Sequence, residues 1–216
     1  FYLPVSVFYS TNFFTVIMIK AKHHKVIYPM FQWLSKFLIN RNFNSVNVSG
    51  EFTDNGKSIL VIANHVSWWD GFWINYLNQK LLNRKFHFMM LEDQLKKHWY
   101  FHYTGGYSVK KKSRSILNSI SYSIELLQQP ENLVLMFPQG EIHSIYNDAV
   151  AFENGVERII KKTASETQVV FVANLIDYFS DSKPNLFIYF KSFLAQDFQK
   201  NTVENLTESF LKQQQN

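Results

Sequence analysis

The stretch that decides the fold is residues 58–70, which read SILVIANHVSWWD. After the initial serine the next five residues, Ile59 to Ala63, are apolar, and such a short run predicts a strand buried inside a sheet. Asn64 and His65 follow this strand at once, and the tryptophan-rich residues after them lead into a helical pattern. Open α/β sheets bind their ligands beyond the carboxyl ends of the strands. We therefore expect the chemistry of this protein at this junction.

Strand-like and helix-like segments alternate along the rest of the chain. Short apolar runs bounded by turn residues predict further strands at 46–48, 85–91, 107–109, 133–137, 169–175 and 186–190. Apolar residues spaced three and four apart predict helices at 28–39, 69–81, 94–102, 116–127, 155–164 and 203–211. The first of these helices is expected to present one apolar face, formed by Met30, Phe31, Leu34, Phe37 and Leu38. This order predicts a single α/β domain with a mixed, mostly parallel sheet flanked by helices.

Composition narrows the classes of protein and of chemistry. The chain has 216 residues and no cysteine, which excludes disulfides, thiolate nucleophiles and cysteine-based metal sites. Its 21 phenylalanines are explained either by core packing or by contact with something apolar. The net charge of +5 suits an anionic partner such as a phosphate, a membrane surface or a nucleic acid. Net charge by itself does not choose among these partners.

The N-terminal residues have the pattern of a segment that associates with membranes. Residues 1–19 contain no charged side chain, but their polar residues favour a position in the membrane interface over a clean transmembrane span. Lys20, Lys22 and Lys25 follow as a basic group suited to anionic lipid headgroups. The alternative is a buried helix with a solvated basic end. We expect residues 1–45 to form an apolar, basic, helical membrane-associating segment and residues 46–216 to form the α/β domain.

His65 and Asp70 are five positions apart, a spacing that places them on different faces of one helix. They meet only if His65 lies in the turn before the helix and Asp70 in its first turn. Asp70 would then hold one ring nitrogen of His65, and the other would take a proton from a substrate hydroxyl. In the alternative interpretation Ser67 is the N-cap of the helix and Asp70 is structural.

Four motifs in order carry a resemblance to a known family. Residues 64–70 resemble the NHxxxxD motif of the glycerolipid and lysophospholipid acyltransferases, and residues 137–141, FPQGE, resemble their FPEG motif. Between them residues 105–111, GGYSVKK, resemble the family's glycine-to-basic motif. Downstream, residues 169–173, VVFVA, resemble the strand usually written VVPVA. The resemblance covers residues 45–195, and four ordered motifs are far more specific than any one of them.

The resemblance implies a glycerol-3-phosphate acyltransferase-like fold and transfer of an acyl group from acyl-CoA or acyl-carrier protein to a hydroxyl of a lysolipid. His65 would be the general base and Asp70 would orient it, and neither a cofactor nor a metal is needed. The implied partners are membrane lipids and the acyl donor, on a peripheral or monotopic protein that faces the cytoplasm. The residues implied to bind substrate are Asn64, Gly105, Lys110, Lys111, Phe137, Pro138, Gln139, Gly140 and Glu141.

The third motif departs from the family pattern. Gln139 replaces the usual glutamate, and residues 141–144, EIHS, stand where threonine, arginine and serine are typical. Neutral His143 is a poor substitute for an arginine that binds phosphate. A lysophosphatidate acceptor is therefore in doubt, and a lyso-aminolipid or another lysolipid fits equally well.

Other interpretations stay open. Pro138 and Gly140 would make a tight turn after a strand whatever the function, and the lysines at 110–112 could form a solvated basic loop. The protein could be a lipid-binding relative without activity, or an acyltransferase for an amino- or glycolipid acceptor. A nucleic-acid binder that uses the basic, aromatic residues 96–114 would leave the ordered motifs unexplained, so we expect no nucleic-acid partner. The other histidines lack the spacing of metal ligands, and surface or packing roles are expected for them.

Overall fold

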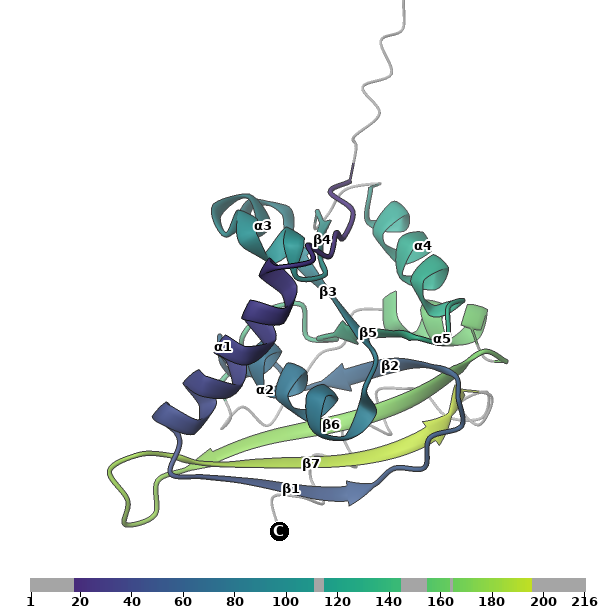
Figure 1. Ribbon diagram of the computed structural model, residues 1–216. Coiled ribbons are helices and arrows are strands. Elements are labelled where there is room, and N and C mark those ends of the chain that lie inside the picture. Colours follow the sequence, from purple (N-terminus) through teal and green to yellow (C-terminus); the bar gives the residue numbers. More distant parts are fainter. Residues whose placement is uncertain (1–17, 111–114, 145–154, 164, 196–216) are drawn as a thin grey trace, which may run out of the picture.

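The computed structural model describes residues 18–110, 115–144, 155–163 and 165–195. Within these ranges the chain forms a seven-stranded sheet with helices on both faces (Figure 1). The strands are β1 (Ser45–Glu51), β2 (Ser58–Ala63), β3 (Lys85–Leu91), β4 (Gly106–Val109), β5 (Asn132–Met136), β6 (Thr167–Asp177) and β7 (Asn185–Leu194). The helices are α1 (Ile27–Asn42), α2 (Asp70–Leu77), α3 (Glu92–Lys97), α4 (Ile116–Leu127) and α5 (Gly155–Thr163), with a π-helix η1 (Asn78–Leu82) and a 3₁₀-helix η2 (Trp99–Tyr103).

The strands lie in the order β1-β7-β6-β2-β5-β3-β4. From β6 to β4 all neighbours are parallel, whereas β7 runs antiparallel to β6 and β1 runs parallel to β7. The predicted mixed, mostly parallel sheet is confirmed. Because five strands run the same way, the segments after β2, β5 and β4 begin at the same edge of the sheet, and these segments carry His65, residues 137–141 and Lys110.

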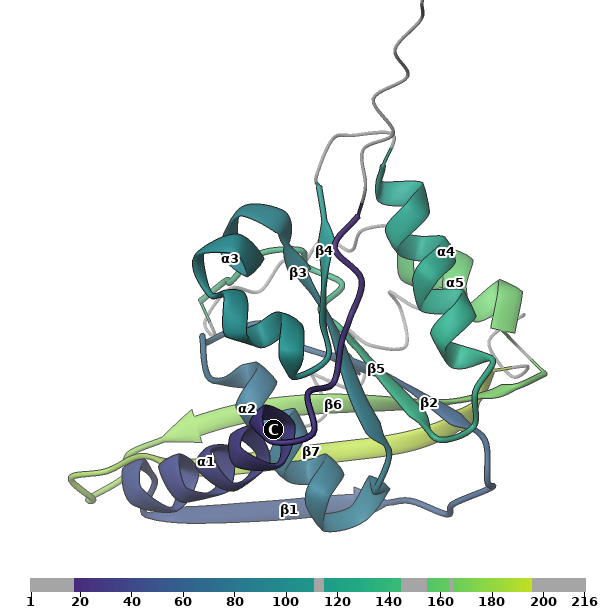
Figure 2. The ribbon, with the colours of Figure 1, turned by 45° about the horizontal axis from the view of Figure 1, so that its top comes forward.

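The strand β2 lies near the middle of the sheet, and all six of its residues are buried. Ile59 and Val61 belong to the core under α1 and α2, whereas Leu60 and Ile62 belong to the core under α4 and α5. Figure 2 shows these helix pairs on opposite faces of the sheet. A strand covered on both faces needs apolar residues at every position, and this is why residues 59–63 form one continuous apolar run.

Of the apolar face predicted for α1, only Phe31 is among the buried residues of the helix. Its buried residues are Phe31, Ser35 and Ile39, one turn apart. Ser35 is tolerated there because its hydroxyl donates to Phe31 O and accepts from Asn75 Nδ2 of α2. Apolar spacing alone passes over a serine, so it did not identify the side of α1 that is buried. The large side chains that remain exposed on α1 are Met30, Trp33, Leu34 and Phe37.

The chain before α1 runs beside β4 and covers that edge of the sheet (Figure 2). Ile19 N donates to Ser108 Oγ at 2.8 Å, and Ser108 N donates to Ile19 O at 2.9 Å. Residues 18–42 thus pack against the α/β domain, and the boundary expected at residue 45 stays a prediction. None of the helices in the described ranges is both long and apolar enough to cross a membrane. Most of residues 1–19, and the helix predicted at 203–211, lie outside the described residues.

The remaining predicted elements differ from the structure mainly at their ends. The helix expected at 69–81 begins at Asp70 and continues into the π-helix after Leu77. The helix expected at 94–102 is two short elements, α3 and η2, separated at His98. The helix predicted over 155–164 is α5.

Candidate active site

His65 lies just beyond the carboxyl end of β2, and its neighbour Asn64 ties this end to β6. Asn64 Nδ2 donates to Asn174 O at 2.9 Å, and Asn174 N donates to Asn64 Oδ1 at 2.8 Å. The nitrogen and the oxygen of the buried Asn64 amide are therefore both hydrogen-bonded to the backbone of β6. Asn64 fixes the position from which His65 projects, and its contact with substrate stays a prediction.

His65 and Asp70 form a hydrogen-bonded pair. Nδ1 of His65 lies 2.8 Å from Oδ2 of Asp70, which is the first residue of α2. The same carboxylate oxygen accepts the backbone N–H groups of Val66 at 2.7 Å and Ser67 at 2.9 Å. The loop between β2 and α2 thus folds around the carboxylate and brings together two residues five positions apart, as predicted. Ser67 does not cap the helix, because its hydroxyl accepts from Trp69 N at 3.2 Å before the helix begins.

The electrostatics of the pair decide which imidazole nitrogen can accept a proton. Asp70 is fully buried, and burial raises the pKa of its carboxyl, whereas the hydrogen bonds from His65, Ser67 and Val66 oppose that rise. An ionised carboxylate only accepts hydrogen bonds, so Nδ1 of His65 donates and Nε2 carries the free lone pair. The His65 side chain is 22% exposed, which leaves it accessible to a substrate. Among the described residues nothing is hydrogen-bonded to Nε2.

The turn after β5 packs directly against His65. The ring of Phe137 stacks on the imidazole, with centroids 4.1 Å apart and planes 10° apart. Oε1 of Gln139 accepts the backbone N–H of His65, and His143 N donates to His65 O at 2.9 Å. Gly140 closes the turn, with φ at 68° and its N–H donating to Phe137 O at 3.1 Å. Of the residues that the resemblance implied for substrate binding here, Phe137 and Gln139 therefore contact His65.

Glu141 and His143 lie close to each other at the end of this turn. Nε2 of His143 lies 3.6 Å from Oε1 of Glu141, and the His143 side chain is 31% exposed. A role in binding substrate stays a prediction for Pro138, Gly140 and Glu141. The expected tight turn after the strand is present.

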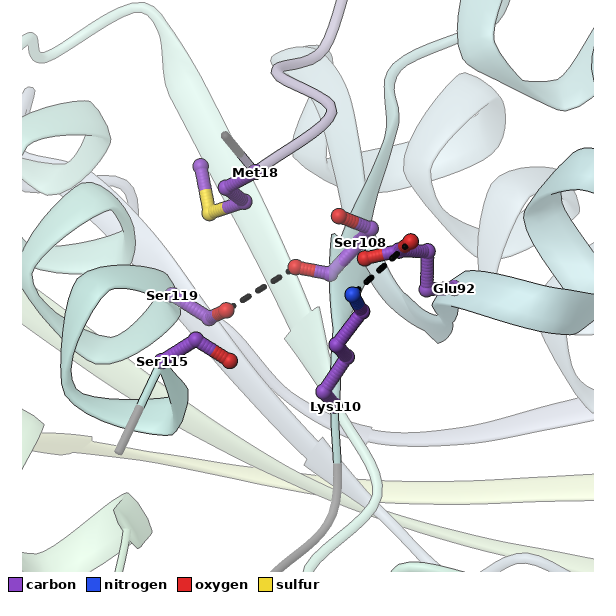
Figure 3. Close-up of a pocket in the computed structure, with 6 residues that line it drawn as sticks. All are labelled: Met18, Glu92, Ser108, Lys110, Ser115 and Ser119. Carbon is purple, nitrogen blue, oxygen red and sulfur yellow. Dashed lines mark hydrogen bonds and ion pairs between the residues drawn. The ribbon is translucent and has the colours of Figure 1, made fainter. Parts of the chain in front are cut away.

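The glycine-to-basic motif, residues 105–111, begins just before β4 and continues past its end. Gly105 has φ at 105°, and an added Cβ would lie 2.0 Å from Phe86 O, so this position requires glycine for a backbone reason. Lys110 Nζ lies 3.2 Å from Oε1 of Glu92 (Figure 3). The same oxygen accepts from Lys96 Nζ at 2.6 Å. The Lys96 ammonium, followed by that of Lys110, holds the pKa of Glu92 below its usual value.

Lys110 is thus paired with a carboxylate, at a small pocket that also includes Met18, Ser108, Ser115 and Ser119 (Figure 3). Three strand spacings, from β2 through β5 and β3 to β4, separate it from the base along the sheet edge, or about 14 Å. Its role in binding substrate stays a prediction. Lys111 lies outside the described residues. Among the residues that the structure describes, no three His, Asp or Glu side chains are placed to hold a metal ion.

Sequence reasoning missed the partners of several site residues. The partner of Asn64 is 110 positions away, and the side chain that supports His65 N is 74 positions away. A signal existed only in the strand register: Ile62 pairs with Met136, so the third residue beyond each is His65 and Gln139. Glu92 as the partner of Lys110 had no comparable signal.

Comparisons with known proteins agree with this geometry. The Acyltransferase family matches residues 45–175, more than half of the chain. The fold is similar to the crystal structure of the 1-acyl-sn-glycerophosphate (LPA) acyltransferase PlsC from Thermotoga maritima, with a TM-score of 0.56 and 18% sequence identity. That match covers 86% of this chain and 75% of PlsC. No curated protein matches the sequence. The chain belongs to the Acyltransferase family, and the resemblance to the glycerolipid acyltransferases is confirmed.

Proposed function

We propose that this protein transfers a fatty acyl group from a thioester, acyl-CoA or acyl-carrier protein, to a hydroxyl of a lysolipid. The observation that carries the proposal is the His65–Asp70 pair, at the end of a central strand in a chain of the Acyltransferase family. The similarity of the fold to an LPA acyltransferase supports a lysolipid acceptor. The missing arginine at 141–144 favours an acceptor other than lysophosphatidate.

The reaction needs one base and no enzyme nucleophile. The acceptor hydroxyl gives its proton to Nε2 of His65 while its oxygen attacks the thioester carbonyl carbon. The carbon–oxygen bond of the new ester forms, the carbon–sulfur bond breaks, and the leaving thiolate takes the proton from the imidazolium. Asp70 stabilises that imidazolium and holds the ring in the reactive tautomer, since its carboxylate accepts from Nδ1.

The test is acyl transfer by purified protein with acyl-CoA and a panel of lysolipids, measured as thiol release and as acylated lipid. We expect His65→Ala to lower kcat by roughly 10²- to 10⁴-fold. His98→Ala is the matched control, because this imidazole lies away from the motif turns and bonds to Tyr100. Equal activity of His65→Ala and the wild type would refute the proposed base.

We also propose that the protein binds the surface of a membrane through the exposed side of α1. Trp33 and Phe37 stack there with ring centroids 5.4 Å apart, although 64% and 43% of their surfaces are exposed. Residues 1–50 contain five basic side chains and no acidic one. Exposed aromatic rings next to basic residues suit the interface of an anionic bilayer.

Sedimentation with vesicles that contain anionic lipid tests this membrane contact. We expect the double variant Trp33→Ser with Phe37→Ser to weaken binding by roughly tenfold. Leu117→Ser is the control, since Leu117 is similarly exposed but belongs to α4 on the other face of the sheet. Unchanged sedimentation of the double variant would remove α1 from the membrane contact.

A further inference from the structure

The backbone of His65 is held from outside its own loop. Beyond Ala63 the chain leaves the β2–β5 ladder, so the N–H and C=O of His65 need other partners. The turn after β5 supplies both, through Oε1 of Gln139 and the backbone N–H of His143. Asp70, by contrast, holds the imidazole and the two following N–H groups. Side chain and backbone of the base are thus fixed by different elements.

Gln139 is only 7% exposed, and its acceptor oxygen carries no charge. A carboxylate in the same place would also accept the His65 N–H, but it would add a second negative charge beside the imidazole. The charged or titratable groups on the described elements around His65 are Asp70 on α2, Glu141 and His143 on the turn, and Asp177 at the end of β6. Of these, Asp70 is the one bonded to the imidazole.

We propose that Gln139 is a positioning residue: its neutral oxygen fixes the backbone of His65 and leaves Asp70 as the carboxylate that sets the working pH range of the base. This inference rests on the proposed function, because it concerns the same base. It assigns Gln139 to the support of His65 and not to the binding of substrate.

Two variants separate the hydrogen bond from the charge. Gln139→Leu keeps the approximate volume and removes the acceptor, so the His65 backbone loses one support. We expect kcat to fall roughly 10- to 100-fold, with the KM for acyl-CoA nearly unchanged, because misplacing a catalytic group slows the chemical step. Gln139→Glu restores an acceptor oxygen, so most of kcat should return at the optimum pH of that variant.

The pH profile gives the second readout. In Gln139→Glu the added charge favours the protonated imidazole, so the acid limb of kcat/KM should move up by roughly one pH unit. Amide hydrogen exchange at His65 gives a third readout that does not depend on activity: exchange should be faster in Gln139→Leu than in the wild type and in Gln139→Glu.

The outcomes distinguish this inference from the proposed function. If His65→Ala is inactive and Gln139→Leu has the wild-type kcat and amide exchange, the positioning role is wrong and the base stands. If His65→Ala is active, the proposed function is refuted, and the inference about Gln139 is refuted with it. If Gln139→Leu does not fold, Gln139→Glu still decides: an unmoved acid limb overturns the inference, and a limb shifted to higher pH at nearly full kcat supports it.

Discussion

Two side-chain pairs that contain histidine differ in their surroundings: His65 with Asp70, and His23 with His87. At the end of β2, His65 is bonded to a buried carboxylate at 2.8 Å. Beside β3, His23 and His87 contact each other edge to face, with ring centroids 4.7 Å apart. Among the described residues no carboxylate is paired with either of these two rings.

The difference lies in which form of the imidazole each site favours. Burial lowers the pKa of His23 to about 4 and that of His87 to about 3, so both rings are neutral and weakly basic. Asp70 stabilises the charge that His65 acquires when it takes a proton. The carboxylate partner therefore makes the difference between a histidine suited to act as a base and a buried, weakly basic one. A packing role is confirmed for His87, which is buried.

The largest effect is expected when the carboxylate of the first pair is neutralised. Asp70→Asn should lower kcat by roughly 10²- to 10⁴-fold, because the amide no longer stabilises the imidazolium or selects the tautomer. The fold disfavours the charged form of Asp70, since burial raises its pKa, so the variant should melt at the same temperature as the wild type or higher. Asp93→Asn, at an exposed site on α3, is the control. Retention of more than about a tenth of the activity would contradict the assigned role of Asp70.

The second pair should make the fold sensitive to acid. Unfolded histidines bind protons near pH 6.5, whereas folded His23 and His87 do so only near pH 4 and pH 3. The unfolded state therefore holds more protons between these values, and stability is complete above pH 6.5 and falls as pH is lowered. Each ring contributes at most about 1.4 kcal/mol per pH unit to the free energy of unfolding.

Urea unfolding at pH 7, 6 and 5 measures this slope. In His87→Gln the slope of the unfolding free energy against pH should be smaller by the contribution of one histidine, whereas His98→Gln should leave this slope unchanged. Equal slopes in the wild type and His87→Gln would show that the buried pair does not govern the acid response.

A smaller effect is expected at another carboxylate–base contact, between Glu92 and Lys110. The Lys110 side chain is 40% exposed, so solvent screens this pair far more than the His65–Asp70 pair. Glu92→Gln releases Lys110 for an anionic acceptor, and KM for such an acceptor should fall by roughly twofold to fivefold at low salt. The control is Glu157→Gln, which breaks an exposed pair on α5. An unchanged KM would argue against Lys110 as a binding residue for the acceptor.

Much of the candidate site could be predicted because its parts are local. Residues 59–63 are apolar at consecutive positions, and this pattern indicates a strand covered on both faces. His65 and Asp70 are five positions apart across one turn and the start of a helix, so spacing allowed their pairing once the strand was placed, and the structure shows it. The face of α1 could not be predicted in this way, because Ser35 is buried by a hydrogen bond to α2 that the sequence of α1 does not contain.

The succession of strands and helices along the chain, the candidate pair of His65 and Asp70 and the family motifs can all be read from the amino-acid sequence. Tertiary structure alone decided that Ile62 of β2 lies opposite Met136 of β5, and hence that Gln139 and Phe137 reach the base. The physical reason is the range of the interactions. Apolar periodicity records what each segment buries, whereas the register between two strands depends on the packing of the whole sheet between its helix layers.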